Sequence, residues 1–324
     1  MCWERLMGLT GAALLVIAAS ASAQPYPTKP IRLIVASAPG GAPDILARTV
    51  AQKLSDSLGQ QVVIDNRPGA SGLIGAELAA KAAPDGYTLF LGTTTLYATL
   101  PNLKSRLPYD PVRDFVSITQ IAVASNVLVV NPSLSAKSVS ELVLLAKSRP
   151  GSLNYASAGS GTPAHLAGAM LNVMAGIDMT HVPYKGAGPA LMDVIAGQVQ
   201  IIITSPIAAG PHINSGKVRA LATTGAKRNP ALPNLPTVAE ALPGYDITQW
   251  WGISAPARTS PAVVKRLHAE TAKAVNLPDV RERLSREGAI AVGGTPQAFD
   301  AFIAAERKRL GDVIRKAGIP LENG

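Results

Sequence analysis

The chain has 324 residues, of which 47% are hydrophobic and 16% are charged, so it is long enough to build two lobes with buried cores. Its formal net charge is +9, but Lys and Arg are scattered along the chain and only 4% of the residues are aromatic. Proteins that hold single-stranded nucleic acid combine a basic groove with aromatic side chains for base stacking. The composition therefore argues against nucleic acid as a partner and leaves acidic small molecules as candidate ligands.

Residues 1–23 are typical of a secretory signal peptide. Arg5 precedes an apolar run, and Ala21-Ser22-Ala23 forms an A-x-A cleavage site. The apolar run is too short to cross a bilayer, which takes about 20 apolar residues. Cleavage after Ala23 would remove Cys2, the only cysteine in the sequence, so we expect a periplasmic chain without disulfides or Cys-based metal sites.

The first part of the expected mature chain alternates strand and helix patterns. Strand patterns occur at 31–35, 61–65 and 87–91, and helix patterns lie between them at 45–58 and 71–83. Such alternation with short connections is the signature of a parallel sheet with helices on both faces. Thr94 follows the third strand, at the sheet edge where ligands gather in open α/β proteins.

The loop after the first strand carries features of an anion site. Gly40 and Gly41 let the backbone turn tightly and leave its N–H groups open to a ligand. Pro43 suits a first helical turn, and Asp44 is predicted to cap an orphan N–H group there. A helix N-terminus attracts anions. An ordinary turn between strand and helix would show the same residues, so this loop alone defines no site.

A second α/β series follows a loop at 101–111 and strand patterns that end at 127–130. Its helices are expected at 139–148, 164–175, 187–196 and 207–215, and its strands at 153–156, 180–183, 199–203 and 218–223. We expect the chain to cross between lobes near 125 and again near 248, which assigns 24–124 with 248–324 to lobe 1 and 125–247 to lobe 2. Residues 230–245 are expected to form a surface connection, and 260–317 two or three amphipathic helices over the first lobe.

The same loop device recurs in the second series. Ser157 is followed by Gly159, Ser160 and Gly161, then by a Thr–Pro helix start. Two helix-start anion sites in separate halves of one chain indicate a ligand held between two lobes. His165, near the start of that helix, is interpreted as a neutral hydrogen-bonding residue, because the helix dipole disfavours imidazolium there.

Other chemistries have weaker support. The run 159–164 fits a loose dinucleotide pattern, but no acidic residue ends the next strand, so no nucleotide cofactor is predicted. The run 155–159 resembles a hydrolase nucleophile elbow, although Ala156 stands where the first glycine belongs. An exported serine hydrolase that uses Ser157 or Ser160 stays open as the alternative function. Metal-binding motifs are missing from the sequence, so no metal site is predicted.

Short motifs in chain order are similar to those of one known family. They include Tyr26-Pro27-Thr28-Lys29-Pro30-Ile31, Pro39-Gly40-Gly41, Asp65-Asn66-Arg67-Pro68-Gly69-Ala70, Pro84-Asp85-Gly86-Tyr87-Thr88-Leu89, Leu107-Pro108-Tyr109-Asp110-Pro111, Leu153-Asn154-Tyr155-Ala156-Ser157 and Val182-Pro183-Tyr184-Lys185-Gly186. Together they resemble the Bug family, the periplasmic solute-binding receptors associated with tripartite tricarboxylate transporters.

The resemblance implies a two-lobed α/β periplasmic-binding-protein fold of type II, with a mostly parallel sheet in each lobe and the ligand in the cleft. It also implies that the first loop and the second lobe's loop and helix start hold a ligand carboxylate. Thr94 at the strand edge and Thr204, where many members carry an acidic residue, complete the predicted site. The predicted ligand-binding residues are Ala38, Pro39, Gly40, Gly41, Asp44, Thr94, Ser157, Gly159, Ser160, Gly161, Thr162, His165 and Thr204.

The resemblance further implies a non-enzymatic, monomeric receptor that serves a membrane permease or a sensor protein. Two departures from the family pattern bear on the pocket. Ala36 and Ser37 stand where many members have Pro and an aromatic residue, which changes the pocket's shape. Thr204 in place of an acidic residue disfavours a ligand that carries an amine.

Overall fold

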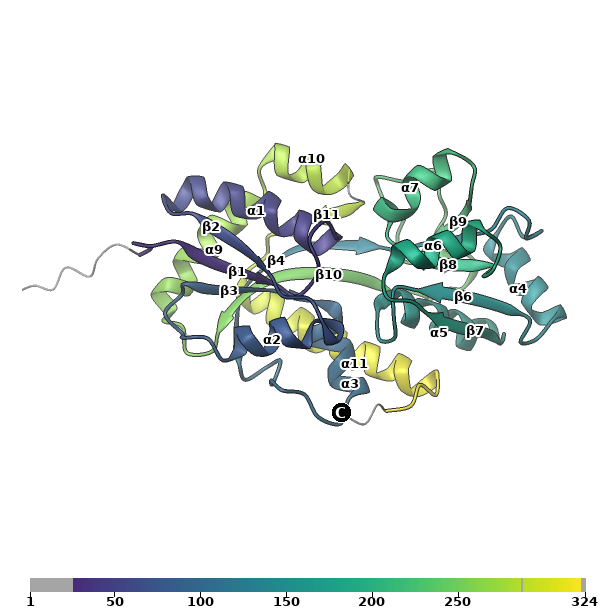
Figure 1. Cartoon of the computed structure of the whole chain (residues 1–324), viewed down its shortest axis with the longest axis horizontal. Coiled ribbons are helices and arrows are strands. Elements are labelled where there is room, and N and C mark those ends of the chain that lie inside the picture. Colours follow the sequence, from purple (N-terminus) through teal and green to yellow (C-terminus); the bar gives the residue numbers. More distant parts are fainter. Residues whose placement is uncertain (1–25, 287, 322–324) are drawn as a thin grey trace, which may run out of the picture.

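The computed structural model describes residues 26–286 and 288–321, which form two α/β lobes side by side (Figure 1). The expected signal peptide lies outside these residues. Strands of the first sheet come from both ends of the described chain, and strands of the second sheet come from its middle. The lobe boundaries near 125 and 248 stay a prediction.

The first lobe is built on a six-stranded sheet in the order β11-β4-β10-β3-β1-β2. Its strands are β1 (Ile31–Val35), β2 (Val62–Asn66), β3 (Thr88–Thr93), β4 (Phe115–Ser125), β10 (Thr248–Pro256) and β11 (Ala289–Ala291). The first three pair in parallel, as their alternation with helices predicts. The sheet is nevertheless mixed, because β10 runs antiparallel to both β3 and β4. These two long strands, β4 and β10, carry the chain between the lobes (Figure 1).

The second lobe has a five-stranded sheet in the order β7-β6-β8-β5-β9. Its strands are β5 (Val127–Val130), β6 (Leu153–Ser157), β7 (Met179–Pro183), β8 (Ile201–Thr204) and β9 (Arg219–Thr223). β6 pairs in parallel with β7 and β8, whereas β5, which enters from the first lobe, is antiparallel to β8 and β9. Both sheets are therefore mixed for the same reason: a strand that arrives from the other lobe joins them in the opposite direction.

Helices cover both faces of each sheet. In the first lobe these are α1 (Ala42–Leu58), α2 (Leu73–Ala80), α3 (Leu100–Leu103), α9 (Pro261–Val275), α10 (Pro278–Arg286) and α11 (Pro296–Lys316). In the second they are α4 (Val139–Ser148), α5 (Pro163–Ala175), α6 (Ala187–Ile195), α7 (Pro206–Asn214) and α8 (Val238–Ala241). The strand β1 shows why helices lie on both sides, since Ile31, Leu33 and Val35 join one core while Ile34 joins the other.

Several expectations differ from the structure. The helix expected at 71–83 is limited to α2, because Ala70 and Ser71 adopt positive φ angles of 47° and 57° and break the helical path. The loop expected at 101–111 begins inside α3, which follows a π-helical turn at Thr95–Thr99. The strand β11 was not predicted, since its three residues are too few to show a period.

The segment expected as a surface connection, 230–245, is partly buried. It contains α8, which starts with a capping box formed by Thr237 and Glu240. Tyr245 is buried, and its Oη donates a hydrogen bond of 2.8 Å to the carbonyl of Ala167 in α5. The C-terminal helix α11 also reaches beyond the first lobe and contacts α5 of the second. These contacts were not predictable from local pattern, because they join segments far apart in the sequence.

The two crossover segments are tied together by one buried threonine. Asn126 donates its backbone N–H to Thr224 Oγ1 at 2.9 Å, and that hydroxyl donates to the carbonyl of Ile247 at 2.6 Å. The backbone of Thr224 also bonds to the carbonyl of Asn126 and to the N–H of Ile247. The lobes are therefore joined where β4 leads into β5 and where the chain returns to β10.

Candidate functional site: an uncharged cavity between the lobes

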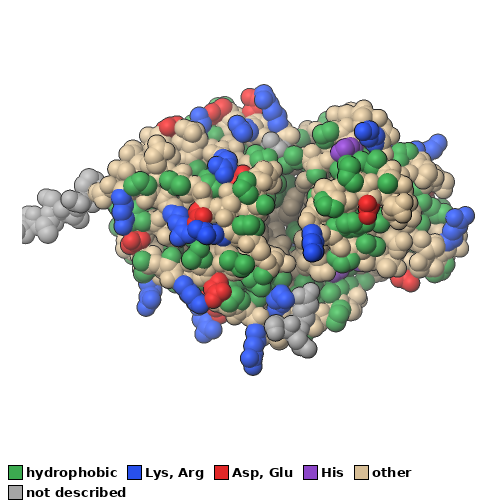
Figure 2. Space-filling model, viewed as in Figure 1, with side chains coloured by type: hydrophobic (Ala, Val, Ile, Leu, Met, Phe, Trp, Pro, Cys, Tyr) green, Lys and Arg blue, Asp and Glu red, His purple; other side chains and the backbone are tan. Residues whose placement is uncertain are grey.

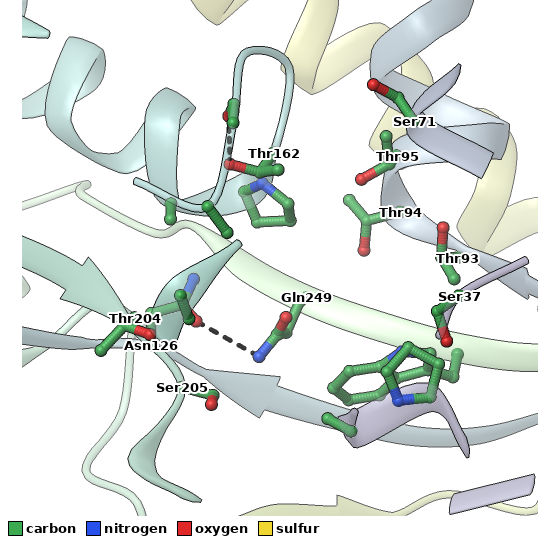
Figure 3. Close-up of a pocket in the computed structure, with 18 of the residues that line it drawn as sticks. Ser37, Ser71, Thr93, Thr94, Thr95, Asn126, Thr162, Thr204, Ser205 and Gln249 are labelled. Atoms are coloured by element: carbon green, nitrogen blue, oxygen red, sulfur yellow. Dashed lines mark hydrogen bonds between the residues drawn. The ribbon is translucent and has the colours of Figure 1, made fainter. Parts of the chain in front are cut away.

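A cavity of about 320 Å³ lies between the two lobes. Figure 2 shows the recess where the lobes meet, and Figure 3 shows the residues around it. Both lobes contribute to the walls, and the crossover segments contribute the residues between them. The lining comprises Ala36, Ser37, Ala42, Pro43, Ser71, Thr93, Thr94, Thr95, Leu96, Asn126, Ala158, Gly159, Ser160, Thr162, Pro163, Ala164, Ala187, Ile203, Thr204, Ser205, Gln249, Trp250 and Trp251.

Four helices begin at this cavity. The start of α1 contributes Ala42, the start of α5 contributes Ala164, α6 contributes Ala187, and α7 contributes its N-cap Ser205. N–H groups in a first helical turn have no partner within their own helix. The helix dipoles add partial positive charge at the same place. The cavity therefore offers anion-binding N–H groups from both lobes, one helix in the first and three in the second.

Among the described residues, no Lys, Arg, Asp or Glu side chain lines the cavity. A cationic ligand would find no carboxylate there, and an anionic ligand would not be held by a formal positive charge. The electrostatic preference comes instead from backbone N–H groups and helix dipoles, whose effect is larger where water is excluded. This arrangement favours a small anion.

Hydroxyl side chains lie on both walls of the cavity, and those of the first lobe include Ser37, Ser71 and Thr94 (Figure 3). Thr94 Oγ1 accepts a hydrogen bond of 2.8 Å from the backbone N–H of Trp250. This bond connects the end of β3 to β10. Ser37 Oγ is buried without a hydrogen-bond partner among the described residues. Ser71 lies on the same wall, with a positive φ of 57° in the turn before α2. The wall thus includes at least one polar atom whose bonding capacity is unused.

The predicted site residues separate into two groups. Five of them line the cavity, namely Thr94, Gly159, Ser160, Thr162 and Thr204. The others do not contribute to the lining, namely Ala38, Pro39, Gly40, Gly41, Asp44, Ser157, Gly161 and His165. Ala38, Pro39 and Gly40 are exposed on the turn between two lining segments, 36–37 and 42–43.

Asp44 is not a helix cap. Gly41 is the N-cap residue of α1, and it makes no side-chain capping bond. The Asp44 carboxylate points back into the loop, where it accepts hydrogen bonds from the Gly40 N–H at 2.9 Å, Arg48 Nε at 3.0 Å and Asn66 Nδ2 at 3.0 Å. Burial raises the pKa of Asp44, but these donors and the Arg48 charge outweigh it and lower the pKa overall. The N–H of Gly40 is therefore already used inside the protein.

Ser157 and His165 belong to a buried cluster behind the second loop. Ser157 Oγ lies 2.7 Å from Nε2 of His181, and the His165 and His181 rings stack with centroids 3.9 Å apart. His165 Nδ1 accepts a hydrogen bond from the Gly161 N–H at 3.2 Å, so this nitrogen carries no proton. Burial and the neighbouring His165 lower the pKa of His181 to about 3. The cluster is neutral and positions the loop that faces the cavity.

The Ser157–His181 contact has the length of a nucleophile–base pair but not its setting. Ser157 is fully buried, so a substrate has no path to its hydroxyl. Its Oγ also donates to the Gly159 carbonyl and accepts from the Gly159 N–H, which ties the hydroxyl to the loop. A general base with a pKa of about 3 would be a poor proton acceptor near neutral pH. The geometry therefore gives no support to the hydrolase alternative.

Several lining residues were missed by sequence reasoning. Asn126 and Gln249 line the cavity and come directly after the expected crossover positions, 125 and 248. Their place next to the crossovers is the sequence feature that could have identified them. Ser205 precedes Pro206, the same cap-and-proline pattern as Thr162 and Pro163. Ala187 begins a helix after Gly186, whose φ of 124° suits glycine. Helix-start patterns in the sequence could therefore have predicted Ser205 and Ala187 as cavity residues.

Two α/β lobes that are joined by crossover strands around an uncharged cavity define a two-lobed solute-binding protein. Residues 46–319 match the tripartite tricarboxylate transporter family receptor, TctC. The chain belongs to this family. Within the described residues, no helix is both long and apolar enough to cross a membrane.

Named relatives are similar along nearly their whole length. The chain is 37% identical to protein BugT of Bordetella pertussis over 99% of this chain and 100% of that protein. The structure of Rpa4515 of R. palustris with adipate has a TM-score of 0.85 and 38% identity, and the match covers 91% of this chain and 99% of that one. MatC of Rhodopseudomonas palustris with bound malate has a TM-score of 0.80 and 32% identity, with 89% and 100% covered.

Proposed function

We propose that this protein is an extracytoplasmic receptor that binds a small organic carboxylate between its lobes and delivers it to a membrane permease of the tripartite tricarboxylate type. The observation that carries the proposal is the convergence of four helix N-termini on a cavity without charged side chains among the described residues. Two similar proteins have structures with the dicarboxylates adipate and malate. Both the family and the electrostatics of the cavity favour a carboxylate as ligand.

In this mechanism the lobes close on the ligand by bending at the two crossover segments, near 125 and 248. Closure expels water, so that neutral N–H donors bind the carboxylate more strongly than they would in an open cleft. The donors would be first-turn N–H groups of Ala42, Ala164 and Ala187, with hydroxyls such as Ser160 completing the coordination. Ala38, Pro39, Gly40 and Gly41 are proposed to contact the ligand only from the rim.

The receptor would act in the periplasm after removal of the expected signal peptide, as a monomer. Its closed form would be recognised by the permease, or by a sensor protein that reports the ligand. The proposal includes no catalytic step. This agrees with the family, whose members are receptors.

Calorimetry and thermal-shift measurements on the mature chain test this proposal. The panel contains mono-, di- and tricarboxylates, including adipate, malate and an aromatic acid, with a polyamine as cationic control. We expect saturable binding of at least one carboxylate and none of the polyamine. Absence of any carboxylate-dependent shift would contradict the proposal. Ester hydrolysis that disappears in Ser157→Ala or Ser160→Ala would instead support the hydrolase alternative.

A further inference from the structure

Two amide side chains meet in the cavity, one from each segment that joins the lobes. Asn126 lies between β4 and β5, and Gln249 is the second residue of β10. Gln249 Nε2 donates a hydrogen bond of 3.2 Å to Asn126 Oδ1, drawn as a dashed line in Figure 3. Both residues line the cavity, with Thr204 and Ser205 beside Asn126.

The amide pair has unused bonding capacity. Asn126 is 3% exposed, and its Nδ2 has no hydrogen-bond partner among the residues that the structure describes. The single bond between the two amides leaves Gln249 Oε1 as a further acceptor. A buried donor without a partner is unfavourable, so a ligand group that bonds to it gains affinity. The pair presents one donor and one acceptor to the same cavity.

The chemistry of this pair selects among ligand groups. A hydroxyl can accept a hydrogen bond from Asn126 Nδ2 and donate one to Gln249 Oε1. A carboxylate can only accept, and it would be repelled by the Gln249 oxygen. A methylene group does neither and would leave the Asn126 N–H groups buried and unpaired. The hydroxyl is therefore the group that satisfies both amides at once.

We propose that the Asn126–Gln249 pair makes this receptor selective for hydroxycarboxylates over unhydroxylated carboxylates of the same length. This inference rests on the proposed function, because the helix N-termini hold the carboxylate while the amides bind the hydroxyl. The two features use different groups, because the donors proposed for the carboxylate are first-turn N–H groups of Ala42, Ala164 and Ala187, whereas the hydroxyl is bound by side-chain amides. Hydroxyl selectivity and carboxylate binding can therefore be separated by experiment.

Calorimetric titration with matched ligand pairs tests the inference. The pairs are malate with succinate, and 2-hydroxyglutarate with glutarate, each hydroxy acid as separate enantiomers. For the wild-type protein we expect one hydroxylated enantiomer to bind at least about tenfold more tightly than its unhydroxylated partner. In Asn126→Leu and in Gln249→Met this ratio should fall to within about twofold. Gln198→Met, a change at an exposed amide outside the cavity, should keep the wild-type ratio.

The outcomes separate the two proposals. Binding of carboxylates without preference for a hydroxyl overturns this inference and leaves the proposed function intact, whereas failure of every carboxylate to bind overturns both. An equal loss of affinity for both members of a pair in Gln249→Met assigns the amides to the hinge and also overturns the inference. If Asn126→Leu does not fold, Gln249→Met decides the question, because Gln249 is only partly buried and changes without loss of volume.

Discussion

The loops that follow β1 and β6 both form a glycine-rich turn that leads into a helix at the cavity. The two loops are stabilised differently. The first loop is organised around a charge, the Asp44 carboxylate, which bonds to Gly40, Arg48 and Asn66. The second is organised around uncharged groups, in which Ser157, His165 and His181 bond to the loop or stack beneath it. In both loops the stabilising groups lie outside the cavity lining.

The contrast between the loops explains how the walls of a binding cavity can stay free of charge. The Asp44 carboxylate is compensated by Arg48, whose guanidinium lies 3.0 Å away, and neither side chain is part of the lining. Beneath the second loop, His181 remains uncharged near neutral pH because burial and the neighbouring His165 lower its pKa to about 3. His165 accepts a hydrogen bond at Nδ1, which therefore carries no proton. The helix N-termini are therefore the dominant electrostatic feature of the cavity, which suits an anion. Four predictions test this comparison.

The largest effect is expected for Asp44→Asn. An amide has one acceptor oxygen and would place its NH₂ group against the donors that the carboxylate satisfies, so Asn is not a conservative change at this position. We expect a loss of about 2–3 kcal/mol in the free energy of unfolding, since hydrogen bonds to a charged group are broken. Urea denaturation measures this loss. A change below about 0.5 kcal/mol would show that the first loop does not depend on its charge.

The pH dependence of stability should differ between the loops. The pKa of His181 is about 3 in the folded protein and about 6.5 in the unfolded chain, so between these values the unfolded state binds a proton that the native state does not. Stability is therefore lost as the pH falls from 6.5 towards 3, by at most about 1.4 kcal/mol per pH unit and less where solvent screens the ring. The contribution of Asp44, whose pKa is lowered from its ordinary value of 3.8, is lost only as the pH falls below that value.

His181→Gln isolates the second-loop contribution, because Gln can bond to Ser157 but does not titrate in this range. The variant should lose less stability than the wild type between about pH 6.5 and about pH 4 in thermal melts. His212→Gln, outside the cluster, is the matched control and should behave as the wild type. If the melting temperature changed with pH in the same way in all three proteins, folding would not lower the pKa of His181.

Helix N-termini in the second lobe can be tested by removing one N–H group. Ala187→Pro places proline at the first position of α6, where proline is favoured, and removes the backbone N–H of a residue that lines the cavity. We expect unchanged thermal stability and about tenfold weaker carboxylate binding by calorimetry, the value of one lost bond to an anion. Ala187→Val keeps the N–H and adds bulk. Equal affinities for the two variants would mean that bulk rather than hydrogen bonding controls binding.

The smallest effect on affinity is expected for Ser37→Ala on the first-lobe wall. The Ser37 hydroxyl has no partner in the described structure, so its removal should change the free energy of unfolding by less than about 0.5 kcal/mol. If the hydroxyl donates to a bound carboxylate, affinity should fall by about three- to tenfold. Calorimetry on the folded variant decides this. An unchanged affinity would show that the Ser37 hydroxyl does not bind the carboxylate.

The alternation of strands and helices, the two glycine-rich loops and the helix starts could be predicted from the amino-acid sequence, because these features depend on residues close together in the chain. Apolar spacing predicted α1 and α5 to within a few residues, and prolines or caps marked where they begin. The motifs that resemble the Bug family also indicated two lobes with a ligand between them. Five of the predicted contacts, Thr94, Gly159, Ser160, Thr162 and Thr204, line the cavity.

Which side chains meet was settled by the packing of distant segments. Asp44 is of a residue type that often caps helices. Its carboxylate instead points into the loop after β1, because Asn66, 22 residues away, supplies a hydrogen-bond donor in that loop. Asn126 and Gln249 are 123 residues apart and come together only because β4 and β10 run side by side. Mixed sheets arise from the same crossing of strands between lobes. Contacts of this kind depend on tertiary structure, and local periodicity contains no information about them.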